Sequence, residues 1–159
     1  MNSFFDALPA ELHAAMIGRL VVAMLLGSVV GYERERTGKP AGVRTQGMVG
    51  LGAALFTVVS LQGFGAAADP TRVAAQVVTG IGFLGAGAIL HERGGVHGLT
   101  TAASLWVTAA TGLTVGVGMI WMSLVTTLLV FLLLHFGPKP GHRTPQAEEG
   151  ATGQNISTG

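Results

Sequence analysis

The chain has 159 residues, which is enough for one domain. Only 11% of these residues are charged, against about 25% in ordinary soluble domains, and 25 are glycine. Together with a mean hydropathy of +0.56, this composition argues against a soluble domain and indicates a polytopic membrane protein. The absence of cysteine excludes disulfides, thiolate metal sites and a cysteine nucleophile.

Residues 1–13 form a short N-terminal segment that contains Asp6 and Glu11 but no Lys or Arg. A secretory signal peptide begins with basic residues. We therefore expect the first apolar run to be retained as a membrane span.

Four stretches with few or no charged side chains follow, and the last of them, Gly98 to Pro138, is about twice as long as one bilayer crossing needs. It must fold back, and the glycines of "GLTVGVG" (112–118) are the expected break. The sequence thus predicts an all-α membrane domain over 14–136. Its five transmembrane helices are expected at about 14–32, 45–64, 72–91, 98–115 and 117–136.

Basic residues in the connections favour one orientation of these helices. They concentrate in 33–44, 92–97 and the tail, whereas 65–72 contains only Arg72 and 113–118 contains none. By the positive-inside rule, the N-terminus is outside and the C-terminus is cytoplasmic. The tail, 137–159, is rich in Pro, Gly, Ser and Thr and is expected to be a disordered cytoplasmic segment.

The third apolar run contains G-x-G-x-x-G, a pattern that can mark a dinucleotide site. Such a site needs a preceding strand and an acidic residue about 20 positions later, and neither is present, since that position is Thr100. Helix packing through small residues is the favoured interpretation. The candidate packing positions are Gly27 and Gly31 in the first span and Gly80, Gly82, Gly85 and Gly87 in the third. Because the third span has glycines on two sides, we expect it to be central.

Hydroxyl side chains recur at helical spacing in the fourth span, at Thr100, Ser104, Thr108 and Thr111. Such hydroxyls can bond to their own helix or to a neighbour. Tight packing is the favoured interpretation, and a narrow polar pathway between the second and fourth spans is the alternative.

Arg19 is the one charged residue inside a predicted span. Intramembrane charges are rare and suggest function by default. Its guanidinium could reach the outer surface. Otherwise it needs a partner, and Asp69, with Arg72 close by, is the expected one.

The cytoplasmic ends carry a belt of charged residues around Glu33, Arg34 and Arg44 and in the connection 91–97. This belt is expected either to anchor the helix ends through a salt-bridge network or to form a docking surface for an anionic or protein partner. All carboxylates lie at span boundaries, in loops or in the tail, so a dehydrated metal site in mid-membrane is not expected. No catalytic constellation, cofactor site or nucleic-acid partner is indicated either, and we expect the protein not to be an enzyme.

Three stretches resemble the MgtC/SapB (MgtC/SapB/SrpB/YhiD) family of bacterial inner-membrane proteins: "GYERERTGKPAGVRTQGMVGLGAALFT" (31–57), "DPTRVAAQVVTGIGFLGAGAIL" (69–90) and "GLTTAASLWVTAATGLTVGVG" (98–118). The resemblance implies a multi-pass protein with about five spans, in the short form without the C-terminal ACT-like domain. It also implies structural or coupling roles for the matching positions. These are Glu33, Arg34, Arg44, Thr45, Asp69, Arg72, Gln76, Thr100, Thr101 and Trp106.

The resemblance further implies an association with magnesium limitation, stress adaptation and survival in macrophages, acting by restraint of the membrane ATP synthase. The preferred hypothesis is therefore a non-enzymatic modulator of membrane machinery or membrane potential. Its partners would be the lipid bilayer, another membrane protein such as the ATP synthase, and a second copy of the chain. A small transporter or channel for Mg²⁺ or another ion is the alternative, and a membrane enzyme ranks third.

The predicted orientation can be tested with reporter fusions. A cytoplasm-active reporter joined after residue 159 is expected to be active, and the same reporter placed in 65–68 to be inactive. The reverse pattern would contradict the orientation.

Overall fold

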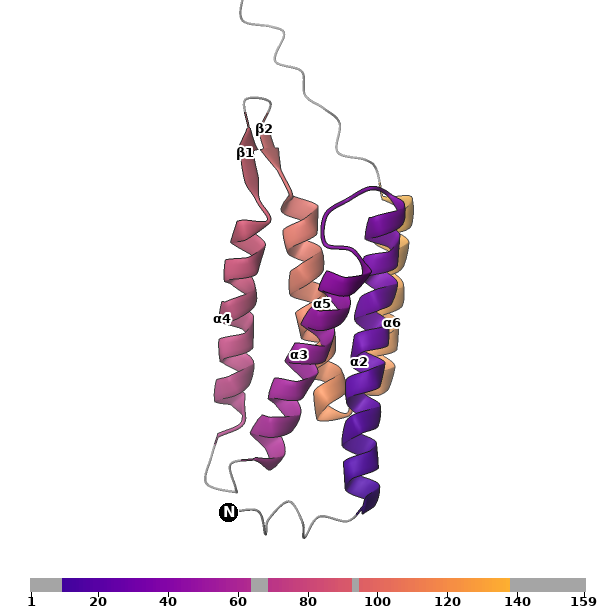
Figure 1. The fold of residues 1–159 in the computed structure, drawn as a ribbon, viewed down its shortest axis with the longest axis vertical. Helices are drawn as coiled ribbons and strands as arrows, with labels where there is room; N and C mark the ends of the chain where they lie inside the picture. The colour runs from indigo at the N-terminus through magenta and orange to yellow at the C-terminus, as the bar shows by residue number, and fades with distance from the viewer. Residues whose placement is uncertain (1–9, 64–68, 93–94, 138–159) are drawn as a thin grey trace, which may run out of the picture.

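The computed structural model describes residues 10–63, 69–92 and 95–137 (Figure 1). Their secondary structure is almost entirely helical. The helices are α2 (Ala10–Arg36), α3 (Val43–Gln62), α4 (Thr71–Gly87), α5 (Leu99–Val117) and α6 (Ile120–Phe136), and the strands are β1 (Leu90–Glu92) and β2 (Gly95–His97). The predicted N-terminal segment 1–13 and tail 137–159 lie mostly outside the described residues.

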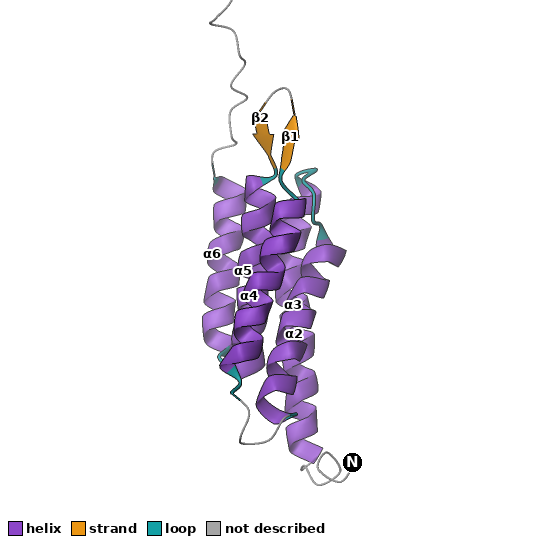
Figure 2. Cartoon of the chain, turned by 90° about the vertical axis from the view of Figure 1, so that its left-hand side faces the viewer, coloured by secondary structure: helices purple, strands orange, loops and turns teal. Residues whose placement is uncertain are grey.

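Successive helices run in opposite directions along one common axis (Figures 1 and 2). We call the end that carries β1 and β2, the α2–α3 connection and the end of α6 the hairpin end. The other end carries the start of α2 and the α5–α6 turn and is called the opposite end. α5 is the central helix, because it contacts α2, α3, α4 and α6.

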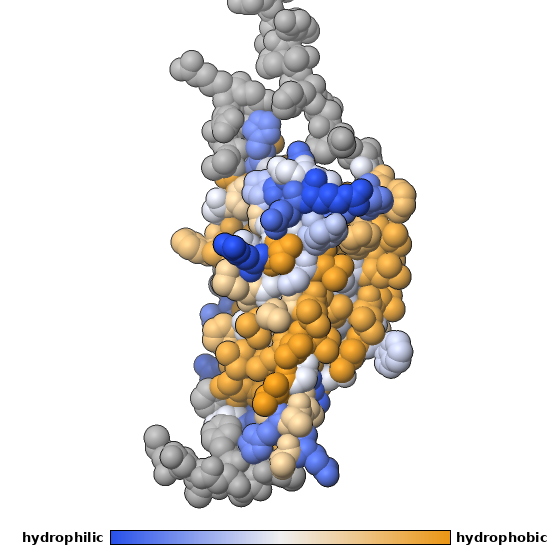
Figure 3. Space-filling view, turned by 45° about the vertical axis from the view of Figure 1, so that its right-hand side comes forward, coloured by the Kyte–Doolittle hydropathy of each residue, from blue (hydrophilic) through white to orange (hydrophobic). Residues whose placement is uncertain are grey.

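Two of the described helices, α2 and α3, are long and apolar enough to cross a membrane, and α6 is a shorter apolar helix. On the face shown in Figure 3, apolar residues form a band between hydrophilic residues at either end. Exposed apolar side chains such as Phe83, Trp121 and Leu133 are typical of a lipid-facing surface. The count of five spans and the orientation stay predictions.

The turn between α5 and α6 lies at the end of the glycine-rich stretch, and not at its middle. Gly118 has φ +102°, a left-handed conformation that favours glycine, and its N–H bonds the carbonyl of Val115. Gly112 and Gly116 remain inside α5 and are buried. The expectation that all three glycines loosen the helix is therefore wrong for these two.

Glycines bring the backbones of α2, α3 and α5 into contact. A Cβ placed at Gly31 would lie 2.6 Å from the carbonyl oxygen of Gly42, and one at Gly50 would lie 2.6 Å from that of Ala23. Gly27 and Gly112 lie equally close to backbone atoms of α3. Gly27 and Gly31, the predicted packing positions of the first span, thus lie against backbone atoms at the start of α3, and similar close approach extends to Gly112 of α5. Small apolar side chains from the same three helices complete this core, namely Ala23, Leu26, Ala54 and Val115.

The packing predicted for the glycines of α4 is wrong within this chain. Gly80, Gly82 and Gly87 have no atom of another element within 4 Å of a Cβ position, and Gly85 makes only ordinary contact with Ala102. α4 lies at the edge of the bundle, beside α3 and α5, instead of at its centre (Figure 1). Small residues recur in α4 as in α2, but no second backbone comes close to Gly80, Gly82 or Gly87 among the described residues.

A short antiparallel hairpin replaces the end of the predicted third span. α4 ends at Gly87, four residues before the expected boundary, and β1 pairs with β2 through His91 and Val96. Gly98, with φ +89°, then starts α5. Residues 93 and 94, including Arg93 of the predicted charged belt, lie outside the described part of the chain, as do the side chains of His91 and Glu92.

The glycine contacts make a stability prediction. Gly50→Ala should destabilise the bundle by about 1–3 kcal/mol, because the added Cβ meets the backbone of α2. Gly82→Ala, the matched control, should leave stability unchanged or raise it slightly, since alanine favours helix and the position is open. Thermal unfolding in detergent measures both, and equal effects would contradict the packing role.

A buried polar cluster at the hairpin end

Polar side chains from four helices gather inside the hairpin end of the bundle. We call this group the polar cluster. Its members are Glu33 and Arg34 of α2, Gln46 of α3, Thr101 and Ser104 of α5 and His135 of α6. Buried polar groups are costly unless they are hydrogen-bonded, so their contacts decide what the cluster can do.

Arg34 is the charged centre of the cluster, with only 5% of its surface exposed. Its Nη2 donates a hydrogen bond to Oγ1 of Thr101, 67 residues away along the chain. Among the residues that the structure describes, no carboxylate forms an ion pair with this guanidinium, and its Nε has no hydrogen-bond partner. The bundle thus holds a positive charge in its interior.

The carboxylate of Glu33 is directed towards α6 and not towards Arg34. Its Oε1 lies 3.1 Å from Nδ1 of His135, and its Oε2 lies 3.7 Å from Nη1 of Arg36. His135 also stacks on Phe131. These contacts join the end of α2 to the end of α6.

Gln46 and Ser104 connect α3 to α5. Nε2 of Gln46 donates to the hydroxyl of Ser104 at 2.8 Å, and that hydroxyl donates to the carbonyl of Thr101. Gln46 is fully buried, and its Oε1 has no hydrogen-bond partner. One continuous set of contacts therefore links α2, α5 and α3.

The hydroxyl series of α5 is largely occupied by its own helix. Thr111 donates to the carbonyl of Val107 and Thr114 to that of Ala110. Such back-bonding is the behaviour expected for hydroxyls in a packed helix. Thr108 is the exception, because its buried Oγ1 has no partner.

Arg19 lies at the opposite end and does not pair with Asp69, so that predicted pair is wrong. Its Nη1 donates to the carbonyl of Gly116 at 3.0 Å, in the last turn of α5. The last carbonyls of a helix lack partners within the helix and attract cations, which explains this choice.

Asp69 instead accepts hydrogen bonds from the backbone N–H and the hydroxyl of Thr71. These bonds, that of the hydroxyl first, hold the pKa of its carboxyl below the ordinary value, and the charge of Arg72 adds to the effect. Asp69 is therefore an anion at neutral pH and sits at the start of α4.

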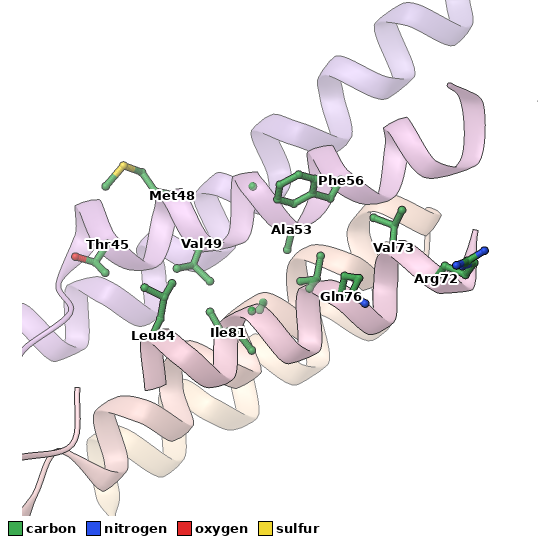
Figure 4. A pocket seen from close by; sticks show the side chains of 14 residues that line it. Thr45, Met48, Val49, Ala53, Phe56, Arg72, Val73, Gln76, Ile81 and Leu84 are labelled. Atoms are coloured by element: carbon green, nitrogen blue, oxygen red, sulfur yellow. The ribbon is translucent and has the colours of Figure 1, made fainter. Parts of the chain in front are cut away.

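The other predicted site residues do not join the polar cluster. Arg44, Thr45, Arg72, Gln76, Thr100 and Trp106 are all exposed. Thr45, Arg72 and Gln76 line a groove between α3 and α4, with a volume of about 830 Å³ (Figure 4). The charged belt thus contains a buried pair, Glu33 and Arg34, and an exposed Arg44.

Gln46 and His135 are members that the sequence analysis missed. Gln46 has a signal, since it precedes Gly47 and lies four residues before Gly50, on the face of α3 that packs. A polar amide on such a face is buried and needs a partner. His135 has no comparable signal, because its position depends on how α6 returns to α2.

Comparison with known proteins shows the relationship of this chain. The family model described as "MgtC family" matches residues 20–142, which include the whole polar cluster. The chain belongs to the MgtC family. This is a family of membrane proteins, in agreement with the two helices that are suited to cross a membrane. Arg19 lies just before the matched region.

Several curated members of the MgtC family are similar to the chain. "Putative magnesium transporter YhiD" of Escherichia coli (strain K12) is 46% identical over 132 residues, covering 77% of this chain and 61% of that protein. "Protein SrpB" of Synechococcus elongatus is 43% identical, covering 84% and 80%. "Protein MgtC" of Brucella abortus (strain 2308) is 49% identical, covering 70% and 46%.

The chain spans about three fifths of the length of the first of these relatives. No solved structure matches it.

The hydrogen bond between Arg34 and Thr101 can be tested with a matched pair of variants. Thr101→Val leaves a buried guanidinium without its acceptor and should destabilise the protein by about 1–3 kcal/mol. The neighbouring Thr100 is exposed, so Thr100→Val should have little effect. Thermal unfolding in detergent is the measurement, and equal stabilities would contradict a structural role for the cluster.

Proposed function

We propose that this member of the MgtC family is a non-enzymatic, multi-pass inner-membrane protein that modulates other membrane machinery under magnesium limitation. Family membership and the printed names of YhiD and MgtC support a link to magnesium. The observation that favours a modulator over a carrier is the buried charge of Arg34.

A fixed guanidinium opposes the passage of cations along α5. Arg34 bonds to Thr101, a buried hydroxyl in the first turn of α5 whose backbone carbonyl also accepts from Ser104 of that series. A divalent cation 4 Å from this charge would meet a repulsion of ~8 kcal/mol at an effective dielectric constant of about 20. Ser104 and Thr111 of the series donate their hydroxyl hydrogens to carbonyls of their own helix, which is the behaviour of packed helix residues.

Mg²⁺ binding sites in proteins use carboxylates together with water. In the part of the chain that the structure describes, no three His, Asp or Glu side chains come together as a metal site. This arrangement gives no direct support to a resident cation.

The outer surface suits contact with a partner in the membrane. Arg36, Lys39 and Arg44 are exposed at the hairpin end, which is cytoplasmic in the predicted orientation. The sides of the bundle expose large apolar residues such as Trp106 and Trp121. We propose a membrane protein as partner, and the ATP synthase is the candidate that the family resemblance supplies.

A small transporter for Mg²⁺ or another ion is the second candidate. The name of YhiD supports it, and so do four buried oxygens without hydrogen-bond partners, on Glu33, Gln46, Thr108 and Thr127. Unpartnered buried oxygens can accept from water or bind a cation. If these oxygens bind an ion in transit, the purified protein should carry that ion across a membrane, which can be measured in liposomes.

The experiment compares a deletion strain at low and high Mg²⁺. The strain should lose growth and show an altered membrane potential only at low Mg²⁺. The full chain should restore both, whereas the charge reversal Arg44→Glu should not, at equal protein level, because it changes the exposed cytoplasmic end. Growth and potential unchanged by the deletion would contradict the proposal.

Purified protein in liposomes separates the two candidates. The modulator is expected to give no Mg²⁺ flux above that of empty vesicles. Flux in the native protein that rises in Arg34→Gln would favour the transporter, since that variant removes the repelling charge.

A further inference from the structure

The groove between α3 and α4 is open, apolar along most of its length and polar at one end. Its α3 wall runs from Thr45 to Phe56 and its α4 wall from Arg72 to Leu84 (Figure 4). Ala109 of α5 also lines it. The remaining lining residues are almost all apolar, namely Met48, Val49, Gly52, Ala53, Val73, Val77, Gly80 and Ile81.

Among the residues that the structure describes, no side chain fills the groove. Gly52 on one wall and Gly80 on the other have nothing within 4 Å of a Cβ position. Protein interiors leave few voids, because a surface without neighbours loses its dispersion contacts. In a membrane, an open apolar groove is therefore occupied by something other than water.

The polar end of the groove carries two hydrogen-bond donors on one helix face. Arg72 and Gln76 are four residues apart on α4, so their side chains lie one helical turn from each other. Both are exposed, and Arg72 lies at the end of the groove (Figure 4).

The dimensions match one lipid leaflet. From Thr45 to Phe56 the α3 wall is ~16 Å long at about 1.5 Å per residue. Half of a hydrocarbon core of about 30 Å is ~15 Å. The polar donors therefore lie where a headgroup would be when the apolar part holds an acyl chain.

We infer that this groove is a binding site for one phospholipid. The guanidinium of Arg72 binds the phosphate, the amide of Gln76 donates to an ester carbonyl, and one acyl chain lies between α3 and α4 along Gly52 and Gly80. Asp69 carries a negative charge near Arg72, and its Oδ1 accepts hydrogen bonds from the backbone N–H and the hydroxyl of Thr71.

A phospholipid explains the groove better than a second copy of the chain. A packed helix would be apolar along its whole length and would leave Arg72 and Gln76 without acceptors. A phospholipid supplies an anion, then carbonyl oxygens, then a hydrocarbon chain, in the order in which the groove presents their partners. This inference does not depend on the proposed modulator function.

The test is native mass spectrometry of the full chain released from detergent micelles after addition of phosphatidylglycerol. The wild-type protein should retain one lipid. Gly80→Leu places a side chain in the groove at a position where an added Cβ would meet no other atom, so the protein should fold and lose the lipid. Gly82→Leu is the matched control, since its position is equally open but does not line the groove, and it should retain the lipid.

The headgroup contact is tested by Arg72→Gln, which should lower retention several-fold, against Lys39→Gln, an exposed cation outside the groove, which should not. Equal retention in Gly80→Leu and wild type would overturn the inference, as would equal losses in Arg72→Gln and Lys39→Gln. A wild-type protein without lipid that cross-links as a dimer, and becomes monomeric in Gly80→Leu, would assign the groove to a second copy and would also overturn it.

Discussion

The close approach of three helix backbones is the constraint on which the rest of this structure depends. In a membrane, apolar side chains gain little free energy by moving from lipid into a protein interior. Helices therefore associate through close packing and hydrogen bonds. Gly31 of α2, Gly50 of α3 and Gly112 of α5 each face the backbone of a neighbouring helix. At such distances no side chain can lie between the helices. Adding even one methyl group at one of these glycines would require the neighbouring helix to move.

The polar cluster is a consequence of that approach. Once α2, α3 and α5 lie against one another, the side chains at their hairpin end are removed from both water and lipid, and each must find a partner inside. Arg34 finds Thr101, and Gln46 finds Ser104. These bonds add specificity, because sliding or rotating any one of the three helices would leave a buried charge or amide without its acceptor.

The sequence predicted the helical class, the places of the helices and the packing of α2, because these follow from the length of apolar runs and the spacing of small residues. It could not predict which carboxylate or carbonyl a charged side chain would meet. Arg19 was expected at Asp69 and lies at Gly116. Both partners are at the same end of the bundle, and the choice depends on which helix is α2's neighbour there. The same dependence on three-dimensional neighbours hid the contact between Glu33 and His135.

The contrast between α2 and α4 shows what small residues alone do not determine. Both helices carry several glycines, yet Gly27 and Gly31 of α2 meet backbone whereas Gly80, Gly82 and Gly87 of α4 meet open space. Glycine in a helix interior costs about 1 kcal/mol relative to alanine. In α2 that cost is offset by contacts with α3, whereas among the described residues no contact offsets it at Gly80. A molecule with both an apolar and an anionic part would supply such a contact, because Gly80 lines an apolar groove with cationic Arg72 at its end.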